Sequence, residues 1–266
     1  MESKEQPDHP VVITIAGSDS GGGAGIQADI KAITATGGFA ASAITCLTAQ
    51  NPDSVSAVEA LPAEFIRQQL EQVVSFFDVS AIKTGMLFNR EIIDTVSHFI
   101  ESHPTIQTVI DPVMVATSGA VLLQPDAIHS ISKKLLPKGT LITPNLDEAG
   151  LLLGKEIKTL SDAEDAAKEL QKKYTTNVLL KGGHLEGSFL QDILVDLQGE
   201  SSIFESKRIE SINTHGSGCT LSSAIATYLA QGLPVVNAIG EALIYLRQTM
   251  QRPIFLNGIP YINHTP

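Results

Sequence analysis

The sequence predicts an α/β fold, a single doubly wound domain with a mostly parallel central sheet and helices on both faces. Short β-branched segments alternate with segments whose apolar residues recur every 3.6 positions. Glycine or polar clusters follow most of the predicted strands, and no repeat or Pro/Ser-rich linker interrupts the chain. Such alternation is typical of right-handed βαβ units. We therefore expect one domain over residues 1–266, including a polar N-terminal tail at 1–10.

The first elements follow from local patterns. A strand is predicted at 11–16, where VVITIA is β-branched and leads into glycine. A helix at 24–36 places its isoleucines on one face and stops at a Gly-Gly pair. A strand follows at 40–48. The next helix opens at Pro62 and keeps helical spacing through Phe77.

The alternation continues to the C-terminus. Further strands are predicted at 81–83, 108–110, 140–143 and 177–180. The helices between and after them are predicted at 91–100, 125–136, 163–173, 219–230 and 235–250. Extended segments at 192–197 and 202–205 are predicted to form an antiparallel hairpin.

Composition excludes several classes of function. The 266 residues carry 18 Lys+Arg and 29 Asp+Glu, a net charge of −11, and the pI is about 5.0. This balance argues against nucleic-acid binding, which needs clustered basic residues. No apolar run approaches the roughly 18 residues that span a membrane, and the N-terminus does not resemble a signal peptide. Two cysteines favour a reducing compartment, so we expect a soluble, cytoplasmic protein.

The predicted topology brings the polar clusters to one edge of the sheet. In doubly wound folds, ligands bind outside the carboxyl ends of the strands. Clusters follow the predicted strands at 17–25, 48–51, 84–86, 111–114, 143–148 and 181–184. Because most of the unusual chemistry of the chain lies there, the pattern favours an enzyme.

The sharpest motif is NTHGSGCT at 213–220, directly before an apolar helix. Glycines at 216 and 218 allow backbone amides to converge, and the helix N-terminus adds its own N–H groups, so an anion such as a phosphoryl group could bind. Cys219 would lie in the first turn, where thiolate is favoured and could act as base or nucleophile. The alternative is a glycine-rich helix cap with an inert buried cysteine.

A second motif is the glycine-rich segment 17–25. Its Gly23-x-Gly25-x-x-Ala28 matches a dinucleotide fingerprint, but it begins too far beyond the first strand for that tight turn. Gln50 also stands where an acidic ribose ligand is expected. A P-loop is excluded, because the chain contains no G-x-x-x-x-G-K-[ST].

Charged residues after other strands suit a phosphate site. Asp111 and Glu148 could hold Mg²⁺, usually through waters, and Lys181 could face the same phosphate oxygens. The alternatives are a turn at Asp111, a helix cap formed by Glu148 with Asn145, and a solvated strand end at Lys181. No histidine pair has metal-ligand spacing, so zinc is not expected.

The motifs in order resemble a known family. GSDSGGGAGIQAD, KTGML, DPVM, TPN, KGGH and HGSGCT span 17–220, and the resemblance runs from about residue 11 to 250. This set is similar to the hydroxymethylpyrimidine/phosphomethylpyrimidine kinases of thiamine biosynthesis, in the ribokinase-like superfamily. Two positions depart from that pattern. Ser217 replaces the usual Thr, and Ala120 stands where an acidic residue is common.

The resemblance implies ATP- and Mg²⁺-dependent phosphorylation of 4-amino-5-hydroxymethyl-2-methylpyrimidine and of its monophosphate, by a homodimer. Cys219 would lie near the substrate hydroxyl, with the amides of Gly216, Ser217 and Gly218 in the anion hole and Lys181 facing phosphate. Nucleotide contacts are implied for Asn145, Lys181, Thr214 and Gly216, and metal contacts for Asp111 and Glu148. The pyrimidine pocket is implied to contain Gly17, Asp29, Gln50, Met86 and Val113.

Residue chemistry favours this substrate over its rivals. The Gln50 amide can pair with both the amino group and the ring nitrogen of an aminopyrimidine, and Met86 and Val113 offer apolar contact. A pyridoxal or pyridoxine kinase of the same family is the nearest alternative, although pyridoxal has no amino group for Gln50. A non-catalytic pyrimidine-binding sensor and, more distantly, a dinucleotide oxidoreductase are the others.

Overall fold

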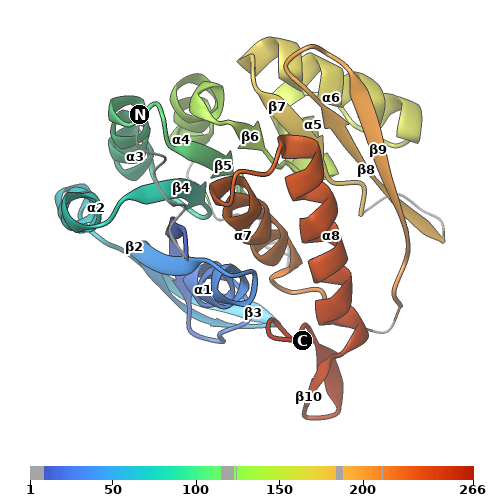
Figure 1. Cartoon of the computed structure of the whole chain (residues 1–266), viewed down its shortest axis with the longest axis horizontal. Helices are drawn as coiled ribbons and strands as arrows, with labels where there is room; N and C mark the ends of the chain where they lie inside the picture. Colours follow the sequence, from blue (N-terminus) through green and yellow to red (C-terminus); the bar gives the residue numbers. More distant parts are fainter. Residues whose placement is uncertain (1–8, 115–122, 124, 184–187, 211) are drawn as a thin grey trace, which may run out of the picture.

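The computed structural model describes residues 9–114, 123, 125–183, 188–210 and 212–266. Within them, one nine-stranded sheet has the order β3-β2-β1-β4-β5-β6-β7-β8-β9 (Figure 1). The strands are β1 Val11–Asp19, β2 Phe39–Asn51, β3 Ser54–Ala60, β4 Val79–Thr84, β5 Gln107–Ile110, β6 Leu141–Ile142, β7 Asn177–Leu180, β8 Phe189–Val195 and β9 Ser201–Lys207. The six that lie from β2 to β7 in this order pair in parallel, whereas β3, β8 and β9 pair antiparallel at the two edges.

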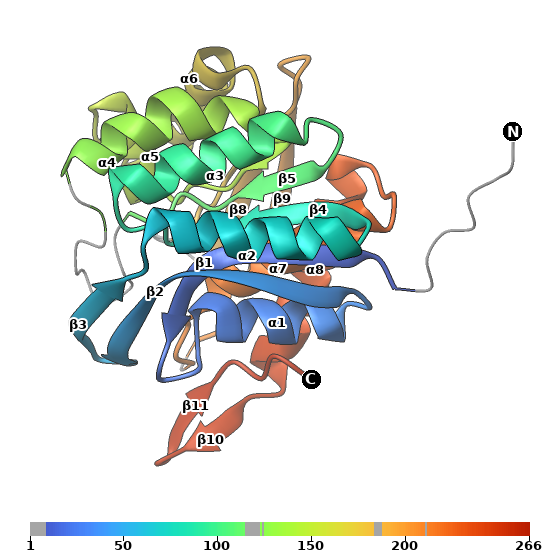
Figure 2. The same ribbon diagram turned by 90° about the vertical axis from the view of Figure 1, so that its left-hand side faces the viewer.

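Helices cover both faces of the sheet, as Figure 2 shows. One face carries α1 Gly25–Ala35, α7 Ser217–Ala230 and α8 Val235–Gln251. The other carries α2 Ala63–Phe76, α3 Arg90–Ser102, α4 Pro125–Ser130, α5 Leu146–Leu153 and α6 Leu160–Tyr174. Alternation along β1 explains the two cores, because Val12 packs with the first group whereas Ile13 and Ile15 pack with the second. The predicted doubly wound architecture is confirmed.

Four elements lie outside the main sequence prediction, although the alternative of a helix capped by Asn145 and Glu148 anticipates α5. β3 extends the sheet beyond β2, α5 follows β6, and a hairpin of β10 Ile254–Leu256 and β11 Ile259–Tyr261 follows α8. The helix predicted at 125–136 also changes form, since α4 continues as a π-helical turn at Ile131–Leu135 and a 3₁₀ turn at Leu136–Lys138. The predicted antiparallel hairpin near the C-terminal edge is confirmed as β8–β9.

The topology determines where a ligand can bind. β1 pairs with β2 on one side and β4 on the other, so the strand order reverses there. The segments after β1, β4, β5, β6 and β7 leave the carboxyl ends of parallel strands, and the N-terminus of α7 meets them there. No helix in the described part of the chain is both long and apolar enough to cross a bilayer.

Candidate active site

The first turn of α7 is shaped by a glycine that no other residue can replace without strain. Gly216 caps the helix at φ 84°, and a Cβ built there would overlap the carbonyl oxygen of Gly23. The Ser217 N–H donates to the Thr214 carbonyl at 3.0 Å, so this amide, expected in the anion hole, already has a partner. Thr220 is the first residue whose N–H bonds back into the helix, at 2.9 Å to Gly216 O. The amides of Gly218 and Cys219 therefore remain for a ligand.

Lys181 and Asp111 lie directly against this helix end. Lys181 Nζ donates to Asp111 Oδ1 at 2.9 Å, and Thr143 Oγ1 donates to the same oxygen at 3.2 Å. A Cβ on Gly218 would lie 3.4 Å from Lys181 Nζ and 3.6 Å from Asp111 Oδ2. Burial lowers the pKa of Lys181, but Asp111 and Glu148 outweigh it and raise that pKa overall. The structure thus brings a charged lysine to the helix N-terminus, where both attract anions.

Glu148 has the helix-capping role that the sequence offers as the alternative to a metal contact. It forms a capping box with Asn145, because Glu148 Oε2 accepts the Asn145 N–H at 2.8 Å and Asn145 Oδ1 accepts the Glu148 N–H at 2.8 Å. Burial is the main reason that the pKa of Glu148 is raised to about 7, with Lys181 lowering it and Asp111 raising it. Two buried carboxylates therefore share a single lysine at this edge.

The thiol of Cys219 differs from the expectation. Burial raises its pKa to about 11, and although Lys83 lowers that pKa, Asp29 and Asp111 raise it further. The predicted preference for thiolate is therefore wrong for this environment, because helix-end stabilisation is weaker than desolvation beside two carboxylates. At neutral pH Cys219 carries its proton, and its sulfur accepts a hydrogen bond from the Gly25 N–H.

Asp29 lies in the interior, although the family resemblance places it in the pyrimidine pocket. Its carboxylate is 0% exposed and receives Lys83 Nζ at 2.8 and 2.9 Å, Thr14 Oγ1 at 2.6 Å and Ser223 Oγ at 2.8 Å. All of these donors are buried. In this structure Asp29 ties α1 to β1, β4 and α7, and it is not exposed at the sheet edge.

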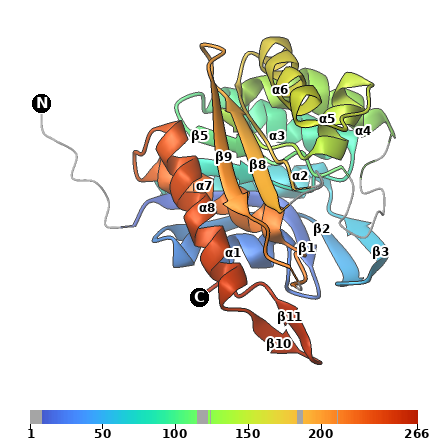
Figure 3. The same cartoon turned by 90° about the vertical axis from the view of Figure 1, so that its right-hand side faces the viewer.

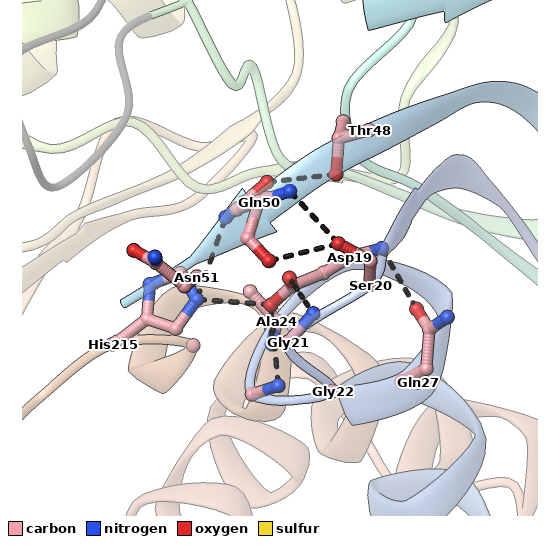
Figure 4. Close-up of polar contacts among 12 residues, drawn as sticks. Asp19, Ser20, Gly21, Gly22, Ala24, Gln27, Thr48, Gln50, Asn51 and His215 are labelled. Atoms are coloured by element: carbon pink, nitrogen blue, oxygen red, sulfur yellow. Dashed lines mark hydrogen bonds and ion pairs between the residues drawn. The ribbon is translucent and has the colours of Figure 1, made fainter. Parts of the chain in front are cut away.

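The backbone N–H groups of the glycine-rich segment after β1 surround the carboxylate of Asp19 (Figure 4). Asp19 accepts N–H bonds from Gly21 at 2.8 Å, Gly23 at 3.1 Å and Ala24 at 2.8 Å, and it also meets His215 Nε2 at 3.0 Å. Burial raises the pKa of Asp19, but these hydrogen bonds lower it overall. The loop amides therefore face a protein carboxylate instead of a pyrophosphate, which contradicts the dinucleotide interpretation.

The remaining expected pocket residues lie at the ends of β1, β2, β4 and β5, where Gly17 is buried and Gln50, Met86 and Val113 are half-buried. A Cβ on Gly17 would lie 3.6 Å from Met86 Sδ, so these two residues are adjacent. Val113 follows Asp111 and donates its N–H to Asp111 O at 2.9 Å. The side chain of Gln50 lies between Thr48 Oγ1, at 3.1 Å, and His215 Nε2, at 3.5 Å, as Figure 4 shows.

Other expectations lie at or beyond the edge of this site. Thr214 is exposed and contributes its carbonyl oxygen to the turn. His184 and Ala120 are outside the described residues. Among the described residues, no group of three or more His, Cys, Asp or Glu could hold a metal ion. The acidic pair Asp111 and Glu148 nevertheless fits Mg²⁺ bound mainly by waters and phosphate oxygens, since Mg²⁺ is usually held by only one or two carboxylates.

Sequence reasoning missed Lys83, Asp19 and the serines of α7. Lys83 is the largest fully buried side chain, yet it lies in an apolar strand where a lysine should be rare. That mismatch was a readable signal for a buried acidic partner. Ser222 Oγ lies 3.4 Å from Asp111 Oδ2, and Ser223 binds Asp29, so neighbouring residues of α7 contact the two carboxylates.

Sequence comparison decides the family. The model described as phosphomethylpyrimidine kinase matches residues 19–261. The chain belongs to the phosphomethylpyrimidine kinase family. A hydroxymethylpyrimidine/phosphomethylpyrimidine kinase of Rhizobium meliloti is 45% identical over 240 residues, which are 89% of this chain and 88% of that protein. The thiamine biosynthesis bifunctional protein ThiED of Geobacter sulfurreducens is 46% identical over 88% of this chain, but the chain spans only 48% of that relative.

Solved structures agree with the family assignment and confirm the ribokinase-like fold class. An ADP complex of Bacillus subtilis pyridoxal kinase has a TM-score of 0.89 and 35% identity, covering 97% of this chain and 98% of that one. Phosphomethylpyrimidine kinase from Clostridium difficile 630 has a TM-score of 0.80 and 38% identity, covering 90% and 98%. The family therefore has relatives named for two different acceptor alcohols.

Proposed function

We propose that this protein phosphorylates 4-amino-5-hydroxymethyl-2-methylpyrimidine and its monophosphate with ATP as the donor, giving the pyrimidine diphosphate used for thiamine phosphate synthesis. The proposal is supported by the family and by the names of its relatives. The observation that carries it is the meeting of the α7 N-terminus with Lys181 and Asp111 at the carboxyl edge of the sheet.

The chain supplies positioning and positive charge for phosphoryl transfer. The amides of Gly218 and Cys219, together with Lys181 Nζ, bind the oxygens of the migrating group, whose charge they stabilise in the transition state. The hydroxymethyl oxygen attacks the γ-phosphorus, and the bond to the β-phosphate oxygen breaks. Cys219 is protonated near neutral pH, so it orients the hydroxyl by hydrogen bonding, and the hydroxyl proton leaves late to the transferred phosphate oxygens.

Asp111 and Glu148 would hold Mg²⁺ beside these oxygens, through waters. The cation supplies neutralisation of phosphate charge. The buried acidic pair supports the fit of a cation here. Burial raises the pKa of Glu148 to about 7, Lys181 lowers that pKa, and the nearby carboxylate of Asp111 raises it. The neutral side chain of Asn145 is placed by the capping box to contact nucleotide at the same edge.

Gln50 is the proposed determinant of the acceptor. Its side-chain amide lies at the end of β2, and the amide nitrogen lies near His215. An aminopyrimidine presents a donor and an acceptor side by side, whereas pyridoxal has no amino group for the Gln50 oxygen. A pyridoxal kinase is the second candidate, favoured by the structural likeness to the Bacillus subtilis enzyme.

The test is an ADP-release assay with hydroxymethylpyrimidine, its monophosphate and pyridoxal as acceptors, each with and without Mg²⁺. We expect Mg²⁺-dependent turnover with a higher kcat/KM for the pyrimidine than for pyridoxal, and the reverse ratio would overturn the assignment. Gln50→Leu should lower the pyrimidine preference by about 1–3 kcal/mol, while Gln50→Glu serves as a matched polar control. The absence of ATP consumption that depends on both Mg²⁺ and the pyrimidine would favour the non-catalytic sensor.

A cytoplasmic homodimer belongs to the same proposal and is supported by the family resemblance. Light scattering on the purified chain measures the mass directly. A mass near twice the 28.3 kDa of the chain supports the dimer, and a mass near 28.3 kDa contradicts it.

A further inference from the structure

The last residues of the chain return to the base of the candidate active site. After α8, the β10–β11 hairpin projects from the body of the molecule. The chain end then returns to that body (Figures 2 and 3). Asn213 N donates to Pro260 O at 2.9 Å, which joins this segment to the loop before α7. Ile262 and His264 are buried, and Tyr245 OH donates to His264 O at 2.6 Å. The C-terminal segment 259–264 is therefore fixed at both ends.

The His264 side chain contacts α7 and the glycine-rich loop, the two segments that meet at the proposed phosphate site. Its Nδ1 lies 3.0 Å from Oγ1 of Thr220, which is the fourth residue of α7. The ring also lies beside the Gly23 backbone, a contact that raises the pKa of His264 against the larger effect of burial. Gly23 O is the atom that packs so closely on Gly216 that no Cβ fits between them. His264 thus bridges the glycine-rich loop and the helix at the point where they touch.

The His264 ring makes its contacts in the uncharged state. Burial is the main cause that lowers the pKa of His264 to about 4, with Lys31 adding to it, so the ring is neutral near pH 7. A neutral imidazole has one donor and one acceptor. Nδ1 shares its hydrogen bond with Thr220 Oγ1, and the same hydroxyl donates to Gly216 O at 2.8 Å. The imidazole therefore belongs to a short hydrogen-bond chain that ends on the residue capping α7.

We propose that His264 is a positioning residue, which holds the first turn of α7 against the glycine-rich loop so that the Gly218 and Cys219 amides stay aimed at the transferred phosphoryl group. The inference rests on the proposed kinase function. Donors that stabilise a transition state must be held in place before the reaction, because reorienting them during it costs free energy. The family match ends at Tyr261, so this role lies in residues beyond it.

A pair of deletions isolates the residue. Removing residues 265–266 leaves His264 in place. Removing residues 264–266 differs from that deletion only by the loss of His264. His264→Phe in the full chain keeps an aromatic ring and removes the hydrogen bond to Thr220. We expect kcat to fall about tenfold in the longer deletion and in His264→Phe. This loss is smaller than the roughly 10²–10³-fold loss of kcat on removing one hydrogen-bond donor to the transition state. KM for the pyrimidine should stay within about twofold, because the bridge touches no proposed pocket residue.

Three further measurements distinguish positioning from general stability. The folded fraction at the assay temperature, from circular dichroism, should be unchanged, and a loss of kcat that merely follows the folded fraction would overturn the proposal. Thr220→Val combined with His264→Phe should cost less than the sum of the single effects, since they remove one shared contact. Hydrogen exchange of the Thr220 amide, which bonds to Gly216 O, should speed up in the longer deletion only. Equal kcat and equal exchange for both deletions would refute the bridge, whereas an inactive full-length chain would refute the kinase assignment instead.

Discussion

Lys83→Met is the change whose effect follows most directly from the structure. Lys83 and Asp29 are both 0% exposed, and the ammonium lies 2.8 and 2.9 Å from the two carboxylate oxygens. Methionine has nearly the same length and leaves little empty space, so the main effect is an uncompensated buried charge. Breaking a buried pair in this way costs about 3–5 kcal/mol. For a chain of this size, about 2–4 °C per kcal/mol gives a drop in Tm on the order of 10 °C.

The double variant checks that the cause is charge. Adding Asp29→Asn to Lys83→Met leaves an amide that still accepts hydrogen bonds from Thr14 and Ser223 but carries no charge, so we expect at least half of the lost stability to return. Urea unfolding followed by fluorescence and circular dichroism gives the free energies of unfolding. A loss below about 1 kcal/mol in Lys83→Met, or a double variant no more stable than the single one, would refute the buried-pair account.

Three other predictions concern the site. Lys181→Met should reduce kcat about 10²–10³-fold, because it removes the charge nearest the Gly218 amide, and a loss under about tenfold in ADP release would contradict its role. In a Cys46→Ala background, alkylation of Cys219 by iodoacetamide should still be rising at pH 9, since the pKa of that thiol is about 11, and a plateau below pH 9 would contradict it. The pKa of His264 is lowered from 6.5 to about 4, so the unfolded chain binds the proton first as the pH falls. Stability should drop by about 3 kcal/mol from pH 6.5 to 4, and His264→Phe should remove that slope in urea titrations.

Local patterns were enough for most of the fold. The strand at Asn177–Leu180 and the long helices could be predicted because buried strands and amphipathic helices follow short-range periodicity. The β10–β11 hairpin was missed although Asn257-Gly258 carries a strong turn signal, and both residues have positive φ in the structure. β3 was missed because its alternating residues are only partly buried at the sheet edge.

The site divides in the same way. Gly216, Lys181 and Asp111 could be placed together because strand ends and helix N-termini meet at one edge of a doubly wound sheet. The raised pKa of Cys219 could not be predicted, since it depends first on burial and then on charged residues distant in sequence. The burial of Asp29 depends likewise on a lysine 54 residues away.

Phosphoryl transfer itself tests the central claim most directly. The protein is incubated with Mg²⁺, hydroxymethylpyrimidine and ATP carrying ³²P at the γ position, beside Lys181→Met under the same conditions. The account predicts label on the hydroxymethyl oxygen of the pyrimidine, formed by the unmodified chain and nearly lost in the variant. Label that stays in ATP or appears only as inorganic phosphate, or equal transfer by both proteins, would contradict it.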